Sequence, residues 1–359
     1  MTNLSDRITF NNGMSMKNRF MLAPLTNQQS FEDGSLSDDE YVWLTYRAEG
    51  QFGMTMTCAS HVQAVGKGFL GQLGIFEDNH IEGHQMLTKA IKRYGSLAII
   101  QLHHAGMKSP EDLIGTKPLC PSDNEEFGAR EMSLEEIYQL RDDFISAAVR
   151  SQIAGYDGVE LHGAHAYIIC QFISSEYNQR TDEYGGSLEN RCRLLFEIID
   201  GVNEKCGGDF LLGVRVSAER FGMDLSEIKQ VCQDIIDTGK VHFLDISLWD
   251  SFKDTEDEKY QDKKLIEHFC DFDTKGVLVG VAGKIMTGPQ VQQIIDYGMD
   301  FAVIGRAAIL HHDFPQKVLE DPNFESVSLP VTREYLASER LSPNFIDYMS
   351  SSRWAFVSK

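Results

Sequence analysis

Eight short apolar runs, rich in β-branched residues, recur along the chain and constrain its fold more than any other feature. They lie at Arg19–Leu25, Gly53–Ser60, Leu97–Leu102, Asp157–His162, Phe210–Ser217, Val241–Leu248, Val277–Gly283 and Phe301–Gly305. Continuous apolar runs of this length are typical of parallel strands that are buried on both faces. We therefore expect a parallel sheet whose faces are covered by other elements.

The longer segments between these runs carry apolar residues at spacings of three and four, which indicates helices. Four of these segments begin with a side chain that can cap the free amides of a first turn: Ser37, Ser133, Ser187 and Thr287. Three end near a glycine suited to a left-handed cap: Gly155, Gly239 and Gly298. Strands and helices are thus expected to alternate along the chain.

Eight strand–helix units with right-handed crossovers close most naturally into a (β/α)8 TIM barrel, which is an α/β fold. An open doubly wound sheet is the second possibility, although no G-x-G-x-x-G follows the first apolar run. No internal repeat or linker is visible, so we expect a single domain over residues 1–359. Additional segments are expected at Gly66–Gly74 and Gly106–Met132, and an irregular tail from about residue 324.

The chain is acidic, with 33 basic and 54 acidic residues and a net charge of −21. Nucleic-acid binding needs clustered Lys and Arg, so neither nucleic acid nor an anionic membrane surface is expected as a partner. The amino terminus has no apolar stretch long enough for a signal peptide, and no segment approaches the roughly 20 apolar residues of a spanning helix. These features predict a cytoplasmic protein that acts on a small molecule.

The seven cysteines are widely scattered and form no C-x-x-C pair. Iron–sulfur and structural zinc spacings are therefore absent, and the odd count favours reduced thiols over a disulfide framework. We expect no metal centre built from cysteine.

Barrel enzymes carry their chemistry at the carboxyl ends of the strands. In this chain those positions hold mostly hydrogen-bond donors and almost no carboxylate: Ala23, Pro24, Thr26, Cys58, Ala59, Ser60, Gln101, His103, His162, His165, Tyr167, Arg215, Ser247, Gly283, Lys284, Gly305 and Arg306. A magnesium site would need oxygen ligands instead. The rim suits a ligand rich in hydrogen-bond acceptors and negative charge.

The last two strand–helix units, "VGVAGKI" and "AVIGRAA", each end a strand in glycine just before a helix begins. Glycine lets the backbone approach a phosphate, and a helix amino terminus offers free amides. Arg306 adds a cation that can bind phosphate through two hydrogen bonds. Gly283, Gly305 and Arg306 therefore predict a phosphate site, with tight-turn glycines and a surface arginine as the alternative.

His162 and His165 stand three residues apart at the end of the fourth apolar run, and three interpretations are open. A zinc site would need a third protein ligand. A structural role would satisfy both rings with backbone groups. The third interpretation is a pair of neutral imidazoles that donate hydrogen bonds to a substrate oxygen and stabilise developing negative charge. Tyr167, protonated at neutral pH, is then placed to donate a proton.

Taken together, these residues resemble the Old Yellow Enzyme family of flavin-dependent oxidoreductases. The matching stretches are "KNRFMLAPLT", "GMTMTCAS", "IIQLHHAG", "GYDGVELHGAHAYIICQFISSEYNQRTDEYGGSLENR", "GVRVSAE" and "AVIGRA". They follow the family's order from Lys17 to about Pro315, and the stretch around His162 is the most specific of them. The resemblance implies a (β/α)8 barrel that binds FMN non-covalently.

The resemblance also implies roles for individual residues. Residues implied to hold FMN are Ala23, Pro24, Thr26, Ala59, Gln101, His162, Arg215, Gly283, Gly305 and Arg306. Among them, Thr26 resembles the hydroxyl that tunes the flavin potential, and Arg215 the cation near the flavin pyrimidine. His162 and His165 resemble the pair that binds the substrate's electron-withdrawing group, and Tyr167 resembles the proton donor.

The implied reaction uses NADH or NADPH to reduce the flavin, which then reduces an activated alkene. Gln28 stands where many bacterial relatives have a substrate-contacting tyrosine, so the resemblance implies that Gln28 contacts the substrate, and its effect on the pocket is in question. The implied protein is a homo-oligomer in which the tail residue Arg353 is a candidate to reach a neighbouring subunit's site. Two other interpretations stay open: a barrel aldolase or isomerase acting on a phosphorylated small molecule, and a flavin-binding protein without catalytic activity.

Overall fold

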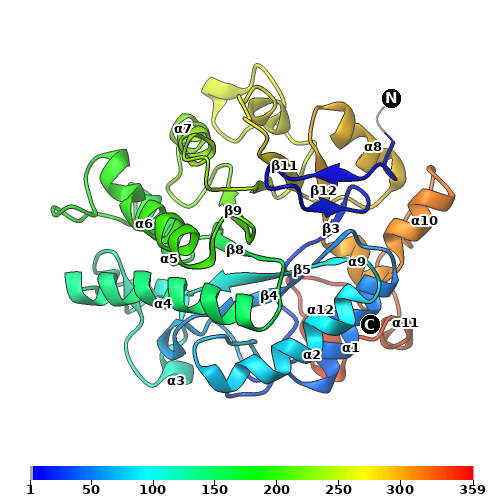
Figure 1. The fold of residues 1–359 in the computed structure, drawn as a ribbon, viewed down its shortest axis with the longest axis horizontal. Helices are drawn as coiled ribbons and strands as arrows, with labels where there is room; N and C mark the ends of the chain where they lie inside the picture. Colours follow the sequence, from blue (N-terminus) through cyan, green and yellow to red (C-terminus); the bar gives the residue numbers. More distant parts are fainter. Residues whose placement is uncertain (1–2, 359) are drawn as a thin grey trace.

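The computed structural model describes residues 3–358, and its centre is a closed barrel of parallel strands (Figure 1). Around the barrel the strands follow the order β10-β11-β12-β3-β4-β5-β8-β9. Their bounds are β3 Phe20–Leu22, β4 Met54–His61, β5 Leu97–His103, β8 Gly158–Gly163, β9 Leu211–Ser217, β10 Phe243–Ser247, β11 Leu278–Ala282 and β12 Phe301–Ile304. Each strand lies within or overlaps one predicted apolar run, so the predicted (β/α)8 fold is confirmed.

Helices surround the barrel on its outer face, as Figure 1 shows. The longer ones are α1 Asp38–Glu49, α2 Ile81–Lys92, α4 Leu134–Ile153, α6 Leu188–Cys206, α7 Leu225–Asp237 and α8 Gly288–Asp296. The predicted caps are confirmed, because the side chains of Ser37, Ser133, Ser187 and Thr287 each accept a hydrogen bond from a first-turn amide. Gly155, Gly239 and Gly298 have φ of +85°, +65° and +101°, as a left-handed helix end requires.

Shorter elements fill the connections between these units. They are α3 Glu111–Ile114, α5 Ile168–Ile173, α9 Arg306–Leu310 and α10 Phe314–Glu320, the 3-10 turns η1 Ala64–Gly66, η2 Asp78–His80, η3 Gly106–Lys108, η4 Glu258–Tyr260 and η5 Leu265–Phe269, and the two-residue strands β1 Ile8–Thr9, β2 Ser15–Met16, β6 Leu119–Cys120 and β7 Arg130–Glu131. Among the helices of residues 3–358, none combines the length and the hydropathy of a membrane-spanning segment.

The segment after residue 324 is more ordered than the expected irregular tail. It contains α11 Arg333–Ser338 and α12 Pro343–Ser350. Phe345 of α12 packs edge-on against Trp43 of α1, with ring centroids 5.6 Å apart. Both rings are buried, so apolar contact with the barrel's helices gives this segment a defined position.

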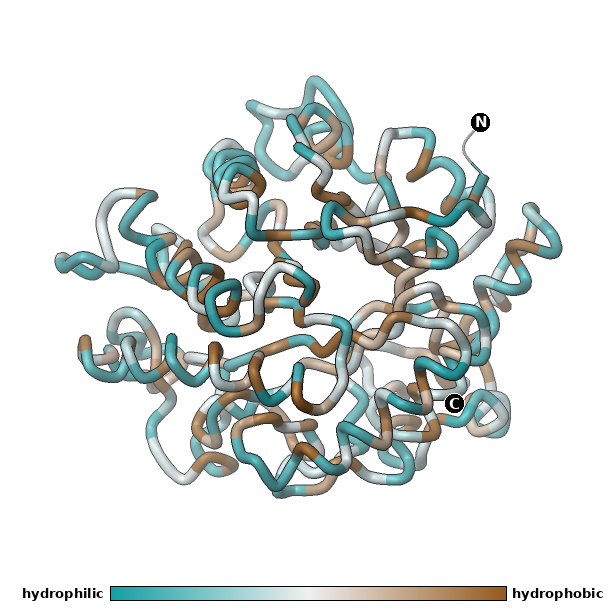
Figure 2. The backbone as a smooth tube through the Cα atoms, in the orientation of Figure 1, coloured by the Kyte–Doolittle hydropathy of each residue, from teal (hydrophilic) through white to brown (hydrophobic). Residues whose placement is uncertain are grey.

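Hydrophobic stretches gather toward the centre of the molecule, while the peripheral loops are largely hydrophilic (Figure 2). Inside the barrel, aromatic rings take the space left by glycines on neighbouring strands. A Cβ atom added to Gly280 of β11 would lie 2.2 Å from Cε2 of Phe301 on β12. Close packing of this kind has no room for an additional methyl group.

We predict that Gly280→Ala destabilises the fold by about 1–3 kcal/mol, because overpacking forces ring or backbone shifts. Urea unfolding of the variant measures this loss. Gly208→Ala is the matched control, since a Cβ atom at Gly208 meets no atom within 4 Å. Equal stability of the two variants would contradict the packing argument.

Candidate active site

A cavity of about 620 Å³ opens at the carboxyl ends of the barrel strands. This volume lies in the range of about 300–1,000 Å³ that is typical of small-molecule sites. The predicted residues that line it are Ala23, Pro24, Thr26, Ala59, Gln101, His162, His165, Tyr167, Arg215, Gly283, Gly305 and Arg306. Residues from across the sequence are thus brought together around one space.

Gln28 is the exception, because it is not among the residues that line the cavity. Its backbone is left-handed, with φ of +57°. Its carbonyl oxygen faces the loop at Gly71, where an added Cβ atom would lie 2.6 Å from that oxygen. This turn of the backbone places Gln28 against a neighbouring loop, which does not support the predicted substrate contact.

The two histidines form a chain of hydrogen bonds that starts at the end of β8. Nδ1 of His162 accepts from the backbone N–H of Ala164 at 3.3 Å, so the proton of a neutral ring lies on Nε2. This Nε2 is 3.4 Å from Nδ1 of His165, whose own Nε2 is 2.7 Å from Oγ of Ser247. The backbone amide of Ala164 therefore favours the Nε2–H tautomer of His162, and both ring nitrogens of His165 face side-chain partners.

Both imidazoles are held in the neutral form. Burial lowers the pKa of His162 and of His165, and the cation of Arg215 lowers both further. Neutral rings can donate N–H hydrogen bonds without adding a full charge to the cavity. Within residues 3–358, no group of three or more His, Cys, Asp or Glu residues is arranged to hold a metal ion.

His165 and Ala166 adopt left-handed backbone conformations, with φ of +61° and +54°. Such conformations cost free energy in non-glycine residues and occur where the surrounding structure enforces them. Here the backbone N–H of His165 donates to Oγ of Ser217 at 2.9 Å, which holds the strained turn in place. The turn directs the chain from β8 into α5 and brings Tyr167 back to the cavity.

Tyr167 lies directly beside the histidines. Its ring centroid is 4.9 Å from that of His162 and 4.3 Å from that of His103. Burial raises the pKa of Tyr167, so the phenol is protonated at neutral pH. A protonated hydroxyl next to two N–H donors can deliver a proton to a ligand that the histidines hold.

A buried charge network lies on the barrel side of the cavity. Nε of Arg215 forms an ion pair with Oδ2 of Asp245 at 3.1 Å, and Nε2 of Gln101 donates to Oε1 of Glu160 at 2.7 Å. Burial raises the pKa of Glu160 well above its ordinary value, and the nearby Asp245 raises it further. Burial and the neighbouring carboxylate thus both favour the protonated form of Glu160, and Asp245 is the ion-pair partner of Arg215.

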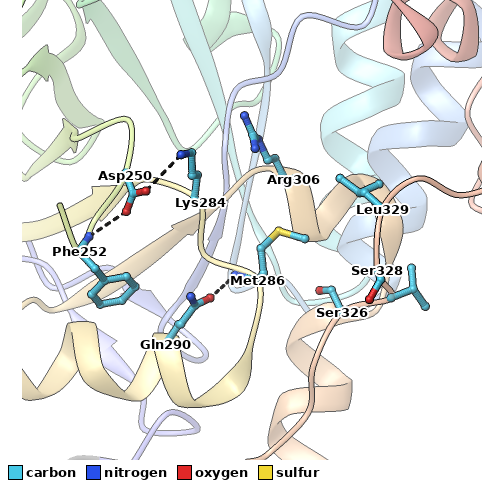
Figure 3. Close-up of a pocket in the computed structure, with 10 residues that line it drawn as sticks. Asp250, Phe252, Lys284, Met286, Gln290, Arg306, Ser326, Ser328 and Leu329 are labelled. Carbon is cyan, nitrogen blue, oxygen red and sulfur yellow. Dashed lines mark hydrogen bonds and ion pairs between the residues drawn. The ribbon is translucent and has the colours of Figure 1, made fainter. Parts of the chain in front are cut away.

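The far end of the cavity is lined by Gly283, Lys284, Gly305 and Arg306. A second cavity of about 400 Å³ adjoins it and shares Lys284 and Arg306 (Figure 3). Figure 3 shows the amine of Lys284 directed toward Asp250, with Nζ and Oδ2 3.2 Å apart. Arg306 has no carboxylate partner within residues 3–358, so its charge is available to a ligand.

Comparison with known proteins identifies the family. The model of the NADH:flavin oxidoreductase / NADH oxidase family matches residues 4–324. The chain belongs to this family, the Old Yellow Enzyme family. It is 35% identical over 325 residues to an NADPH dehydrogenase of Bacillus pumilus, covering 86% of this chain and 92% of that protein.

Other Old Yellow Enzyme relatives agree with this assignment. A probable NADH-dependent flavin oxidoreductase of Bacillus subtilis is 32% identical over 328 residues, which cover 88% of each chain. The solved Old Yellow Enzyme homologue of Zymomonas mobilis is 27% identical, with a TM-score of 0.79 and coverage of 97% of this chain and 99% of that chain. The protein is thus an NAD(P)H-dependent flavin oxidoreductase, and the interpretation as a non-flavin aldolase or isomerase is set aside.

The residues of the cavity are suited to the flavin of the Old Yellow Enzyme family. A Cβ atom added to Gly305 would meet only side chains of Leu25 and Ala23, at 3.6 and 3.8 Å, so packing within the protein does not require glycine there. Because Gly305 has no side chain, there is room beside Arg306 for a ligand group. The hydroxyl of Thr26 makes no hydrogen bond within residues 3–358 and is free to donate to a bound ring.

Several cavity residues were not predicted from the sequence as site residues. They are Lys108, Arg220, Phe221, Ser247, Trp249, Tyr348, Met349, Trp354 and Phe356. Ser247 was visible only as a strand-end residue, and its position beside His165 depends on the closure of the barrel. Arg353 was expected to be a candidate for a neighbouring subunit's site, and the structure places it at the cavity of its own chain.

Proposed function

We propose that the flavin is FMN and that the acceptor is an activated alkene, so that the protein is an ene-reductase. The observation that carries this proposal is the grouping of His162, His165 and Tyr167 around one part of the cavity. Two neutral N–H donors beside a protonated phenol suit a carbonyl or nitro group conjugated to a carbon–carbon double bond. An enzyme that only oxidised NAD(P)H would not need a proton donor in this place.

In this proposal the chain positions and protonates the acceptor. His162 and His165 donate hydrogen bonds to the electron-withdrawing oxygen, and so stabilise the negative charge that develops on it. Tyr167 delivers a proton to the α-carbon of the alkene. FMN, when bound, supplies the hydride chemistry that links NADH or NADPH to the β-carbon.

Other residues would hold the cofactor. Gly283, Gly305 and Arg306 are suited to its phosphate, since they combine backbone access with an unpaired cation. Ala23, Pro24, Thr26, Ala59 and Gln101 would line the ring. Arg215 would stabilise negative charge on the ring, to an extent limited by its ion pair with Asp245.

The test is the visible spectrum of the purified protein before and after anaerobic addition of NADH and, separately, NADPH. We expect flavin absorption bands that bleach with at least one nucleotide and return when an alkene such as cyclohexenone is added. Chromatography of the flavin released on denaturation distinguishes FMN from FAD. Bleaching that no alkene reverses would point to another acceptor, and a yellow protein that neither nucleotide bleaches would support a flavin-binding protein without catalytic activity.

A further inference from the structure

The cavity is positively charged, although the whole chain carries a net charge of −21. Its lining contains six cationic side chains and, among the residues of 3–358, no Asp or Glu: Lys108, Arg215, Arg220, Lys284, Arg306 and Arg353. A cavity lined by one sign of charge concentrates ligands of the opposite sign. Only some of these cations have a carboxylate partner or a proposed ligand.

Three of the six are paired with carboxylates: Arg215 with Asp245, Arg220 with Glu256 and Lys284 with Asp250. Arg306 lies at the end proposed for the cofactor's phosphate. Within residues 3–358, Lys108 and Arg353 have no carboxylate partner. These two cations therefore have no counter-charge in this part of the protein or in the proposed cofactor.

Lys108 lies beside the group that would bind the acceptor. It ends the turn η3 after β5, and its Nζ donates to the backbone carbonyl of His165 at 2.8 Å. The same nitrogen is 5.5 Å from the ring centroid of Tyr167. Lys108 is half-buried, so its charge is desolvated without a counter-ion, which is costly unless a ligand supplies one.

Arg353 approaches the same region from the segment after α12. Its guanidinium stacks over Trp354, 4.9 Å from the ring centroid, and both residues line the cavity. Burial lowers the pKa of Lys108, and the charge of Arg353 lowers it further. The two cations line the same cavity, and neither has a carboxylate partner within residues 3–358, so both would attract an anionic ligand group.

We propose that Lys108 and Arg353 form a subsite for a carboxylate, so that the preferred acceptor is an activated alkene that also carries a carboxylate group. This proposal rests on the proposed ene-reductase function for its alkene part only. The reaction adds a hydride from NAD(P)H to the β-carbon and a proton from Tyr167 to the α-carbon. The double bond becomes a single bond, NAD(P)⁺ is released, and the carboxylate is unchanged.

The test uses two pairs of ligands, each an acid and its methyl ester, and compares the acid-to-ester ratio of each variant with that of the unmodified enzyme. Binding of 4-hydroxybenzoate and of methyl 4-hydroxybenzoate to the oxidised holoenzyme is followed by the change in the flavin spectrum, which needs no turnover. Reduction of 4-oxo-2-pentenoate and of its methyl ester gives the corresponding kcat/KM ratio. We expect the acid of each pair to be preferred by about tenfold or more, which corresponds to about 1.4 kcal/mol.

Lys108→Gln should bring both acid-to-ester ratios close to one, because the half-buried lysine is the stronger contact. Arg353→Gln should lower them by a smaller factor, since Arg353 is exposed and its charge is screened. Lys89→Gln is the matched control, because it removes an exposed lysine on α2 and should leave both ratios unchanged. Added salt should lower the ratios of the unmodified enzyme.

Equal affinity for acid and ester, or ratios that Lys108→Gln does not change, would overturn the subsite. Unchanged ratios with an increased KM for NADPH would overturn it too, and would assign the two cations to the nucleotide's phosphates. A strong preference for 4-hydroxybenzoate that depends on Lys108, found together with no reduction of either alkene, would support the carboxylate subsite while refuting the ene-reductase function. The two proposals can therefore fail separately.

Discussion

Tyr167→Phe should slow the reduction of an alkene by the reduced enzyme by about 10²–10⁴-fold, the usual contribution of a positioned general acid. The substitution removes only the hydroxyl and keeps the ring that packs 4.3 Å from His103 and 4.9 Å from His162. Reduction of the flavin by NADH or NADPH requires no proton from this phenol, so its rate should change little. Stopped-flow absorbance measures the two half-reactions separately.

Tyr348 provides the control for this prediction, because it also lines the cavity and carries a hydroxyl. Tyr348→Phe should leave the rate of alkene reduction within a few-fold of the unmodified enzyme. If Tyr348→Phe produced the large loss, the proton donor would be Tyr348. Equal losses in both half-reactions of Tyr167→Phe would show that the variant disturbs the cavity and that Tyr167 is not the specific acid.

The strands could be predicted because their positions depend on a local property. Buried parallel strands must be apolar on both faces, and the eight apolar runs stand out without knowledge of their neighbours. The predicted strand ends were less accurate where a residue interrupts the hydrogen bonding of the strand. The first run was expected at Arg19–Leu25, yet β3 covers only Phe20–Leu22, since Pro24 lacks the N–H that a longer ladder would need.

The motif residues of the candidate site could also be predicted, because a barrel brings all strand ends to one rim. Lys108 and the cavity residues of the segment after α12 could not be predicted, since they reach the cavity through contacts that no periodicity encodes. Val331 pairs with Val357, and the backbone N–H of Phe356 donates to the carbonyl of Met349. The position of Gln28 depends on a left-handed backbone that its side chain does not specify.

Replacing both His162 and His165 by Ala should abolish the long-wavelength absorption band that simple phenols give with the oxidised flavin, while the protein stays yellow. The two rings are neutral N–H donors that line the cavity together with Tyr167, and a lost donor to a developing oxyanion costs about 10²–10³-fold in rate. Alkene reduction should therefore fall by at least that factor. Phenol titration and single-turnover kinetics measure the two effects.

A single substitution separates loss of a donor from loss of packing. His165→Asn keeps an N–H donor of smaller size, whereas His165→Ala keeps none. If donation to the ligand is the role of His165, Asn should retain much more activity than Ala. Ser247→Ala removes the hydroxyl 2.7 Å from Nε2 of His165. It should lower the activity less than His165→Asn or His165→Ala does. Loss of the flavin from the double variant would instead assign the pair to cofactor binding, because the colour depends on the cofactor alone.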